Sequence, residues 1–207
     1  NEQYTEAIPR FSEVAGKTKN DSLQQRLQAR IVVCYMRLDN MKEAEKRIAG
    51  FLKSAPTASA SMAEFEFERG KYHLRKDELV KAGQRFELVR RQYPTSPIIP
   101  ETMYWIARAH ELREQPQYAI QVYDSILLLY PTNSIVPRTQ LSLGNVYYNL
   151  EQWDPAAKLF KTILDHADRS PDLVQYAMNN LILTYKELNL FDAALEMTRK
   201  YIAQYPE

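Results

Sequence analysis

The chain has a single cysteine, Cys34, among its 207 residues. One thiol excludes a disulfide within the chain. A single cysteine is compatible with a reducing compartment, and it is equally compatible with a periplasmic protein that has no disulfide. Cys34 lies between Val33 and Tyr35 in a helical pattern, so we expect a buried, inert thiol. A reactive thiolate would need a cationic neighbour, and Arg30 and Arg37 are within helical reach.

Glycine is also scarce, with five residues in the whole chain. Neither a G-x-G-x-x-G pattern nor a P-loop pattern occurs, so the chain lacks the sequence signatures of the common phosphate-binding loops. Two of the glycines, Gly70 and Gly144, fall at a repeated position described below. The composition therefore leaves little for a nucleotide site.

The chain has no excess of charge of either sign and no long apolar run. Its net charge is +1, so no global field selects nucleic acid, a membrane surface or an acidic substrate. No stretch approaches the apolar length that a membrane-spanning helix needs. What the sequence does contain is a long-range repeat.

An alanine recurs every 37 or 38 residues along the whole chain. A large side chain follows four residues later in five of the six units, and proline follows twelve residues later in four of them. The alanines are Ala7, Ala44, Ala82, Ala119, Ala156 and Ala194. Upstream, a second set of positions repeats in the same register: Val32, Gly70, Ala107, Gly144 and Ile182, each followed three residues later by Tyr35, His73, His110, Tyr147 and Tyr185.

The stretch from Leu141 to Ile163 has this pattern in its fullest form, with Leu143-Gly144, Tyr147, Ala156 and Phe160. It resembles the tetratricopeptide repeat (TPR) family, whose unit is two antiparallel helices, A and B. A small residue lets two helices approach closely, a large flat residue fills the groove between them, and proline ends the unit. The resemblance covers the whole chain.

The spacing is longer than the usual ~34 residues of the family. The additional residues lie between units, in the segments 93–100 and 130–137, which both begin Tyr-Pro-Thr; the second continues Asn-Ser and so has the form Tyr-Pro-Thr-x-Ser. This form resembles the bacterial cell-envelope branch of the family, which includes barrel-assembly lipoproteins and periplasmic coordinators of cell-envelope constriction. It implies the bacterial periplasm or cell envelope as the location, with the cytoplasm as the alternative.

The resemblance predicts an all-α fold, a right-handed α-solenoid of antiparallel helix pairs that forms a single TPR solenoid over residues 1–207. We expect a half repeat at 1–19 and repeats at approximately 21–56, 62–94, 100–131, 137–168 and 172–206. Because the chain starts in mid-repeat, we expect a fragment or processed form of a longer protein. The helices are expected at 4–16, 21–38, 41–54, 62–75, 78–92, 101–112, 116–130, 137–150, 155–167, 172–188 and 191–204.

No pattern in the sequence predicts catalysis, a cofactor or a metal. His73 and His110 both fill the tyrosine position of helix A, where an aromatic ring packs between helices, and neither has a third ligand at metal-binding spacing. We therefore expect structural histidines. No Ser/His/Asp or Cys/His arrangement can be argued, so we expect a protein that is not an enzyme unless catalytic residues lie outside this fragment.

One stretch is locally basic. Between Arg69 and Arg91 there are eight basic and three acidic residues. Nucleic-acid binding is one interpretation, but a phosphate-tracking surface normally extends further and interleaves aromatic residues. A solvated surface, or a patch for an acidic protein segment, is favoured.

In the TPR family, helix A lines a concave groove, and the resemblance implies which residues do so here. Several of these are large and apolar or aromatic, which suits an extended peptide or a partner helix; the alternative is that some cover the neighbouring helix A. The predicted partner-binding residues are Phe67, Lys71, Leu74, Tyr104, Arg108, Leu141, Asn145, Tyr148, Tyr176 and Leu183.

The function predicted from these features is a non-enzymatic protein–protein interaction scaffold, with another protein as its partner. The alternative is a structural module that self-associates as a homo-oligomer through the open ends of the solenoid.

Overall fold

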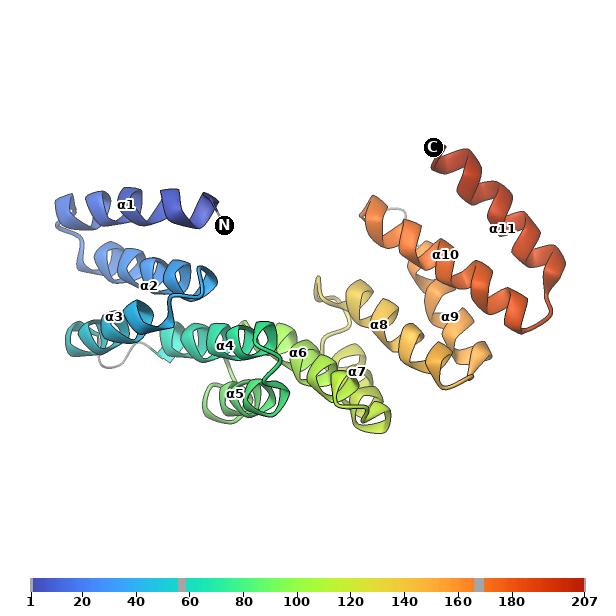
Figure 1. Ribbon diagram of the computed structural model, residues 1–207, viewed down its shortest axis with the longest axis horizontal. Helices are drawn as coiled ribbons and strands as arrows, with labels where there is room; N and C mark the ends of the chain where they lie inside the picture. Colours follow the sequence, from blue (N-terminus) through green and yellow to red (C-terminus); the bar gives the residue numbers. More distant parts are fainter. Residues whose placement is uncertain (1, 56–58, 166–169, 207) are drawn as a thin grey trace. The chain divides into compact units, whose positions relative to one another are not determined.

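The computed structural model describes residues 2–55, 59–165 and 170–206. Within these ranges the chain is all-helical, with eleven helices and no strand (Figure 1). The helices are α1 (Glu2–Lys17), α2 (Asp21–Arg37), α3 (Met41–Ser54), α4 (Ser59–Arg75), α5 (Leu79–Gln92), α6 (Ile99–Leu112), α7 (Pro116–Leu129), α8 (Val136–Asn149), α9 (Trp153–Leu164), α10 (Pro171–Glu187) and α11 (Phe191–Gln204). None of the helices in the described ranges combines the length and the apolar character needed to cross a membrane.

The predicted helices are present, and most of their ends lie within two residues of the expected places. Four starts, those of α1, α4, α6 and α9, were predicted two or three residues too late. Helix α4 begins at Ser59 rather than Met62, and α9 begins at Trp153 rather than Pro155. Pro155 sits in the first turn of α9, where backbone N–H groups have no helical acceptor and proline loses nothing. The predicted unit and helix ends at positions 56, 167 and 168 lie outside the described residues.

Side-chain caps fix three of the helix starts. Asn20 and Asn40 accept hydrogen bonds from the backbone N–H groups of Leu23 and Glu43, at 2.9 and 3.2 Å. Ser170, predicted as an N-cap before Pro171, accepts from the N–H of Leu173 at 3.4 Å. These bonds satisfy N–H groups that the helix itself cannot pair.

Every turn between a helix A and its helix B has the same backbone form. The second-last turn residue has a positive φ of 56 to 59° in each case, although none is glycine. These residues are Asp39, Asp77, Glu114, Glu151 and Asn189. The N–H of the next residue then bonds back to the helix-A carbonyl five positions earlier, as from Gln152 to Tyr147 at 2.9 Å. This pattern is the Schellman motif, which usually places glycine at the left-handed position.

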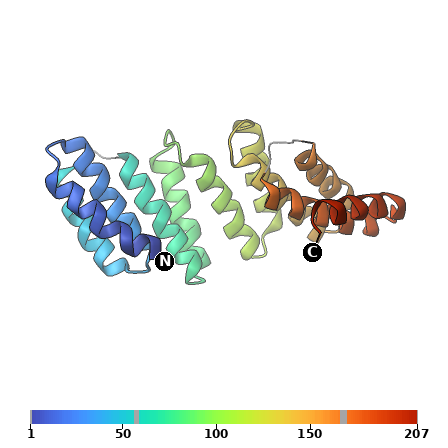
Figure 2. The ribbon, with the colours of Figure 1, turned by 90° about the horizontal axis from the view of Figure 1, so that it is seen from above.

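The chain divides into two compact units, Asn1–Trp105 and Ile106–Glu207, and the boundary falls within α6. In the first unit α1 packs on α2, α2 on α3 and α4, and α4 on α5; Figure 2 shows these helices side by side. In the second unit α8 packs on α7, α9 and α10, and α10 also packs on α9 and α11. Neighbouring helices A therefore touch in each unit, as α2 does with α4 and α8 with α10.

The repeated small residue of helix A is matched by the large residue of helix B. A Cβ atom added at Gly144 would lie 2.5 Å from Cε1 of Phe160, and one at Gly70 would lie 2.4 Å from Cε1 of Phe86. Both phenylalanines are fully buried. The rings thus occupy the space that the two glycines leave open, which explains why these positions lack a side chain.

Candidate peptide-binding pocket

Two of the predicted groove residues belong to the core. Phe67 and Tyr104 are only 2% and 4% exposed. The Phe67 ring packs against Phe86 of helix α5, with centroids 5.6 Å apart, and Tyr104 meets the edge of Trp105 at 5.5 Å. This burial favours the alternative that the sequence left open, in which these residues pack against neighbouring helices; their contact with a partner stays a prediction.

Three further predicted residues are half-buried, and two of them are engaged within the chain. Lys71 places Nζ 5.4 Å from the centre of the Phe67 ring and 3.7 Å from Oε1 of Glu68. Arg108 forms an ion pair with Glu111, which lies three residues further along the same helix. Leu74 is half-buried on the last turn of α4.

The touching helices A of the first unit, α2 and α4, are joined by a ladder of ion pairs. Arg30 lies 2.7 Å from Glu64, and Arg37 lies 2.6 Å from Glu68, which is almost completely buried. Farther along, Arg75 lies 2.9 Å from Asp39. The hydrogen bond to Glu68 raises the pKa of the Arg37 guanidinium above its ordinary value. This surface is therefore filled by its own charges rather than open to a peptide.

The basic side chains between Arg69 and Arg91 are also paired with carboxylates, six of them for the eight cations. Each of the eight basic side chains lies within 4.0 Å of a carboxylate oxygen. Several of the carboxylates belong to other segments of the unit, such as Asp39 and Glu45, and this is why the local count overstated the charge. These contacts argue against a surface of free cations for nucleic acid, since such a surface needs cations available to phosphates.

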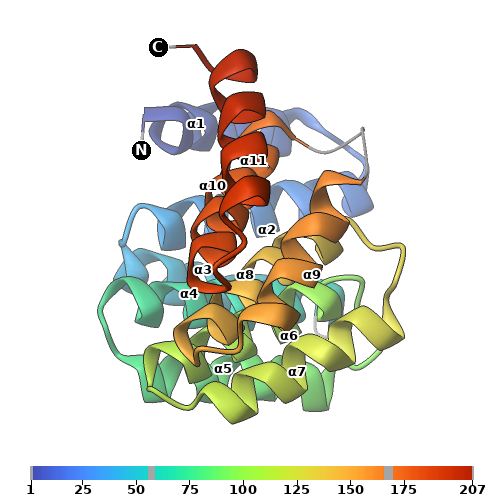
Figure 3. The same ribbon diagram turned by 90° about the vertical axis from the view of Figure 1, so that its right-hand side faces the viewer.

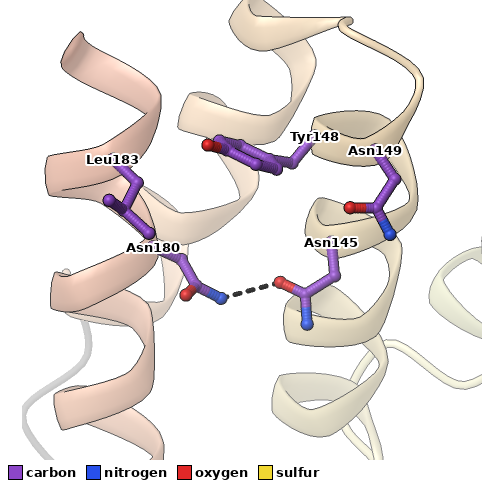
Figure 4. A pocket seen from close by; sticks show the side chains of 5 residues that line it. All are labelled: Asn145, Tyr148, Asn149, Asn180 and Leu183. Atoms are coloured by element: carbon purple, nitrogen blue, oxygen red, sulfur yellow. Dashed lines mark hydrogen bonds between the residues drawn. The ribbon is translucent and has the colours of Figure 1, made fainter. Parts of the chain in front are cut away.

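A pocket of about 270 Å³ lies between the touching helices A of the second unit, α8 and α10 (Figure 4). It is lined by Asn145, Tyr148 and Asn149 from α8 and by Asn180 and Leu183 from α10. Three of these five were predicted from the sequence as groove residues: Asn145, Tyr148 and Leu183. None of the described residues that line it is charged.

Two of the side-chain amides that line this pocket bond to each other across it. Nδ2 of Asn180 donates a hydrogen bond to Oδ1 of Asn145 at 2.7 Å, as the dashed line in Figure 4 shows. A side-chain amide has two N–H donors and two acceptor lone pairs on oxygen. One bond between the two amides therefore leaves each of them with further capacity, which can serve a ligand in the pocket.

The pocket has a rigid aromatic wall and an apolar wall. The ring of Tyr148 packs edge-on against Trp153, with centroids 4.9 Å apart. Leu183 projects from α10 beside the hydroxyl end of Tyr148 (Figure 4). The pocket thus offers amides for polar contacts and a ring and a methyl-bearing chain for apolar ones.

Sequence reasoning missed Asn149 and Asn180. Asn145 and Asn180 are 35 residues apart, roughly one helical turn less than the repeat spacing. A search for polar residues on successive helices A whose separation is about one helical turn shorter than the repeat could have found this pair. The remaining predicted residues flank this region: Leu141 is half-buried in the apolar cluster around α9 and α10, and Tyr176 is 61% exposed on α10.

The histidines and the cysteine have structural surroundings. Nδ1 of His73 lies 2.5 Å from Glu78, and Nδ1 of His110 lies 2.9 Å from Gln115, each across the turn to helix B. Cys34 is buried, and burial raises the pKa of its thiol against the opposing effect of the nearby arginines. Among the described residues no group of three or more His, Cys, Asp or Glu side chains could hold a metal ion.

Comparisons with known proteins agree with this geometry. Residues 101–133 match the family model "Tetratricopeptide repeat". No curated protein sequence matches the chain significantly. Similar solved structures are BtubC (BKLC) from P. vanneervenii, with a TM-score of 0.76, 13% identity and coverage of 98% of this chain and 88% of that one. YrrB, described as "a TPR protein with an unusual peptide-binding site", has a TM-score of 0.63 and 17% identity, covering 95% and 93% of the two chains.

A third similar structure is PilF from Pseudomonas aeruginosa, with a TM-score of 0.66 and 15% identity, covering 99% of this chain and 94% of that one. Likeness at this level of identity establishes the fold. Together with the repeat register and the helix pairs, these matches identify residues 101–133 as a tetratricopeptide repeat and give the chain the α-solenoid fold of the tetratricopeptide-repeat proteins.

Proposed function

We propose that this protein is an interaction scaffold that binds an extended, uncharged peptide segment in the pocket between α8 and α10. Solenoid proteins use the surfaces created by stacked repeats to hold other proteins. The pair of pocket amides, Asn145 and Asn180, is the observation that carries the proposal.

The chemistry of the pocket fits a peptide backbone. A side-chain amide can donate to a backbone carbonyl and accept from the backbone N–H of the same residue, because it carries both functions in one plane. Tyr148 and Leu183 then supply apolar contacts for one side chain of the bound segment. Since the described residues that line the pocket are all uncharged, an uncharged segment avoids the desolvation cost of an unpaired charge.

The test is binding of the purified protein to an array of short synthetic peptides without charged side chains. We expect a subset to bind the wild type, and binding to fall roughly tenfold in an Asn145→Ala/Asn180→Ala variant, because a lost hydrogen bond is worth about 0.5–1.5 kcal/mol. Asn179→Ala is the matched control, since Asn179 is exposed on α10 outside the pocket.

A second measurement separates backbone recognition from side-chain packing. Methylation of the backbone nitrogen at the residue that occupies the pocket should abolish binding, while the same methylation elsewhere in the peptide should not. Equal binding by the wild type and the double alanine variant would refute the proposal, as would an array on which no peptide binds.

The bacterial periplasm or cell envelope stays the predicted location, supported by the Tyr-Pro-Thr-x-Ser segment at 130–134 and the related Tyr-Pro-Thr segment at 93–95. Fractionation of the native cells with an antibody against the protein tests it, and recovery only in the cytoplasmic fraction would contradict it.

A further inference from the structure

The outer face of α11 bears an apolar stripe. It is formed by Phe191, Leu195, Thr198 and Ile202, which follow one another at intervals of four, three and four residues and therefore share one side of the helix. Phe191, Leu195 and Ile202 are 62%, 51% and 61% exposed. Figures 1 and 3 show α11 alongside α10, with no other helix of the second unit on its far side.

The stripe is more apolar than a surface that faces only solvent. Terminal repeats of a solenoid need a polar outer face to stay soluble alone, and three large apolar side chains on one exposed stripe do the opposite. Burial of such side chains against a partner is favourable by the hydrophobic effect. The stripe is therefore built to be covered.

One position of the stripe, Thr198, differs from the corresponding position of the other helices B. At the position of Thr198 the other units have large side chains: Phe11, Ile48, Phe86, Tyr123 and Phe160. The ring of Phe86 stacks on Trp105 of the following helix A, with centroids 6.5 Å apart. Thr198 cannot make such a contact, and its hydroxyl donates to the carbonyl of Ala194 in its own helix.

Charges beside the stripe are segregated along the helix. Asp192 lies in the first turn and Arg199 lies two turns later, on the same flank of the stripe. Neither has an ion-pair partner in the part of the chain that the structure describes, whereas Glu196 and Lys200 are paired with each other at 2.7 Å. An acidic first half and a basic second half on one flank are self-complementary when two such helices run antiparallel.

We propose that α11 is a homodimerisation surface, on which α11 of a second copy packs antiparallel about a two-fold axis. In this arrangement Phe191 of one copy faces Ile202 of the other, and Leu195 faces Thr198. Asp192 then lies beside Arg199 of the second copy, and the symmetry makes this contact twice. The helix dipoles are also antiparallel, which favours the pairing.

The contact is small, and this sets the expected strength. Interfaces that bury less than roughly 1,200 Å² of total accessible surface are typically weak or transient. We expect a contact made by one helix from each copy to fall below this area. We therefore expect dissociation in the micromolar range or weaker, and a further weakening at high salt, because the two ion pairs lie at the rim.

The first experiment measures the molar mass of the 207-residue protein by light scattering and sedimentation over a wide concentration range. We expect the mass to rise from that of one chain to that of two. Leu195→Glu should stay monomeric, because it places a carboxylate in the centre of the stripe. Leu128→Glu is the matched control, since Leu128 is an exposed leucine on α7, and it should dimerise as the wild type does.

The second experiment tests the antiparallel register. Asp192→Arg alone and Arg199→Asp alone each place like charges together at both symmetric contacts, so each should weaken dimerisation roughly tenfold or more. The variant with both changes restores opposite charges and should recover the dimer. Circular dichroism checks that all variants keep the helical content of the wild type.

Several outcomes would overturn the proposal. A wild type that stays monomeric up to its solubility limit would leave the stripe to another occupant, either a different protein or a further helix of a longer chain. A dimer that survives Leu195→Glu would use another surface. Dimerisation is independent of the peptide pocket: Asn145→Ala/Asn180→Ala should still dimerise, and Leu195→Glu should still bind the peptides of the array.

Discussion

At Gly144 we expect steric overlap to outweigh helix propensity in setting the stability of an alanine variant. Replacing a helical glycine by alanine normally stabilises a helix by about 0.5–1 kcal/mol. Here the new methyl group would meet the fully buried ring of Phe160, and overpacking of a core typically costs about 1–3 kcal/mol. We expect Gly144→Ala to lower the free energy of unfolding by about 1–2 kcal/mol.

Chemical denaturation of the purified variants measures this change. Gly50→Ala is the matched control, because Gly50 lies in α3 with no atom within 4 Å of an added Cβ, and it should raise stability by up to about 1 kcal/mol. The same sign at both positions would show that the Phe160 ring moves aside at little cost.

Asp39 gives a pH dependence at the residue scale. A hydrogen bond from Lys76, together with one from Arg75, lowers the pKa of the Asp39 carboxyl below its ordinary value. Its contribution to stability is therefore present above the unfolded pKa of about 3.9 and is lost as the pH falls through the lower folded pKa. Because the side chain is partly exposed, we expect a modest effect.

Asp39→Asn is the variant that tests this. Asparagine tolerates the positive φ of 57° at this position, so the backbone should be unchanged. Thermal melting should show a lower midpoint than the wild type at pH 7, and the difference should shrink as the pH falls below about 4. A difference that is constant with pH would mean that the charge of Asp39 contributes nothing.

At the scale of single elements, the turns between helices A and B carry a removable strain. A non-glycine residue in the left-handed region costs roughly 1–2 kcal/mol, and glycine would avoid this cost at the expense of about 0.5–1 kcal/mol of chain entropy. Glu151 is exposed and has a φ of 59°. We expect Glu151→Gly to raise the free energy of unfolding by up to about 1 kcal/mol.

Urea denaturation of the wild type and the variant checks this expectation. Glu151→Ala serves as the control, because it removes the carboxylate but keeps the Cβ atom, and it should give no gain. Equal gains in both variants would point to the charge of Glu151 rather than to its backbone.

The elements themselves were predictable from the sequence, because the periodic alanines, the large residues and the prolines mark each helix B directly. The early start of α9 was not predictable, because its N-cap residue, Gln152, makes no side-chain hydrogen bond that would mark the start. The Schellman turns escaped prediction for a related reason: their usual marker, glycine, is replaced by Asp, Glu or Asn.

The candidate site was only partly predictable. The register correctly placed Asn145, Tyr148 and Leu183 on the touching faces of α8 and α10. It could not show that Phe67 and Tyr104 are covered, because burial depends on how neighbouring rings fill space. Nor could it pair Arg37 with Glu68 or Asn145 with Asn180, since these contacts join residues 31 and 35 positions apart.

For the whole molecule, stacking predicts a gradient of local stability. In a solenoid each helix is stabilised by its immediate neighbours, so a terminal helix has fewer of them. Helix α1 packs on α2 and α11 packs on α10, whereas α8 packs on three helices. We expect amide hydrogens of α1 and α11 to exchange faster than those of α8.

Hydrogen exchange with mass spectrometry measures this gradient. At low protein concentration, α11 should be among the fastest-exchanging helices, and raising the concentration should slow exchange in α11 but leave α1 unchanged if α11 pairs between copies. Uniform exchange along the chain would instead indicate a single cooperative unit.

The matching of Gly144 with Phe160 has a consequence for how such chains can be recombined. Gly70 and Phe86 share the same close contact. At the corresponding positions the sequence places Val32 and Ile48, Ala107 and Tyr123, and Ile182 and Thr198, so we expect the volume to be divided differently in each repeat. A chimera that joined the helix A containing Gly144 to the helix B containing Thr198 would leave a void, and the reverse exchange would set a phenylalanine against an isoleucine. We therefore expect that a matched pair of helices A and B can be exchanged between repeats, whereas a single helix cannot.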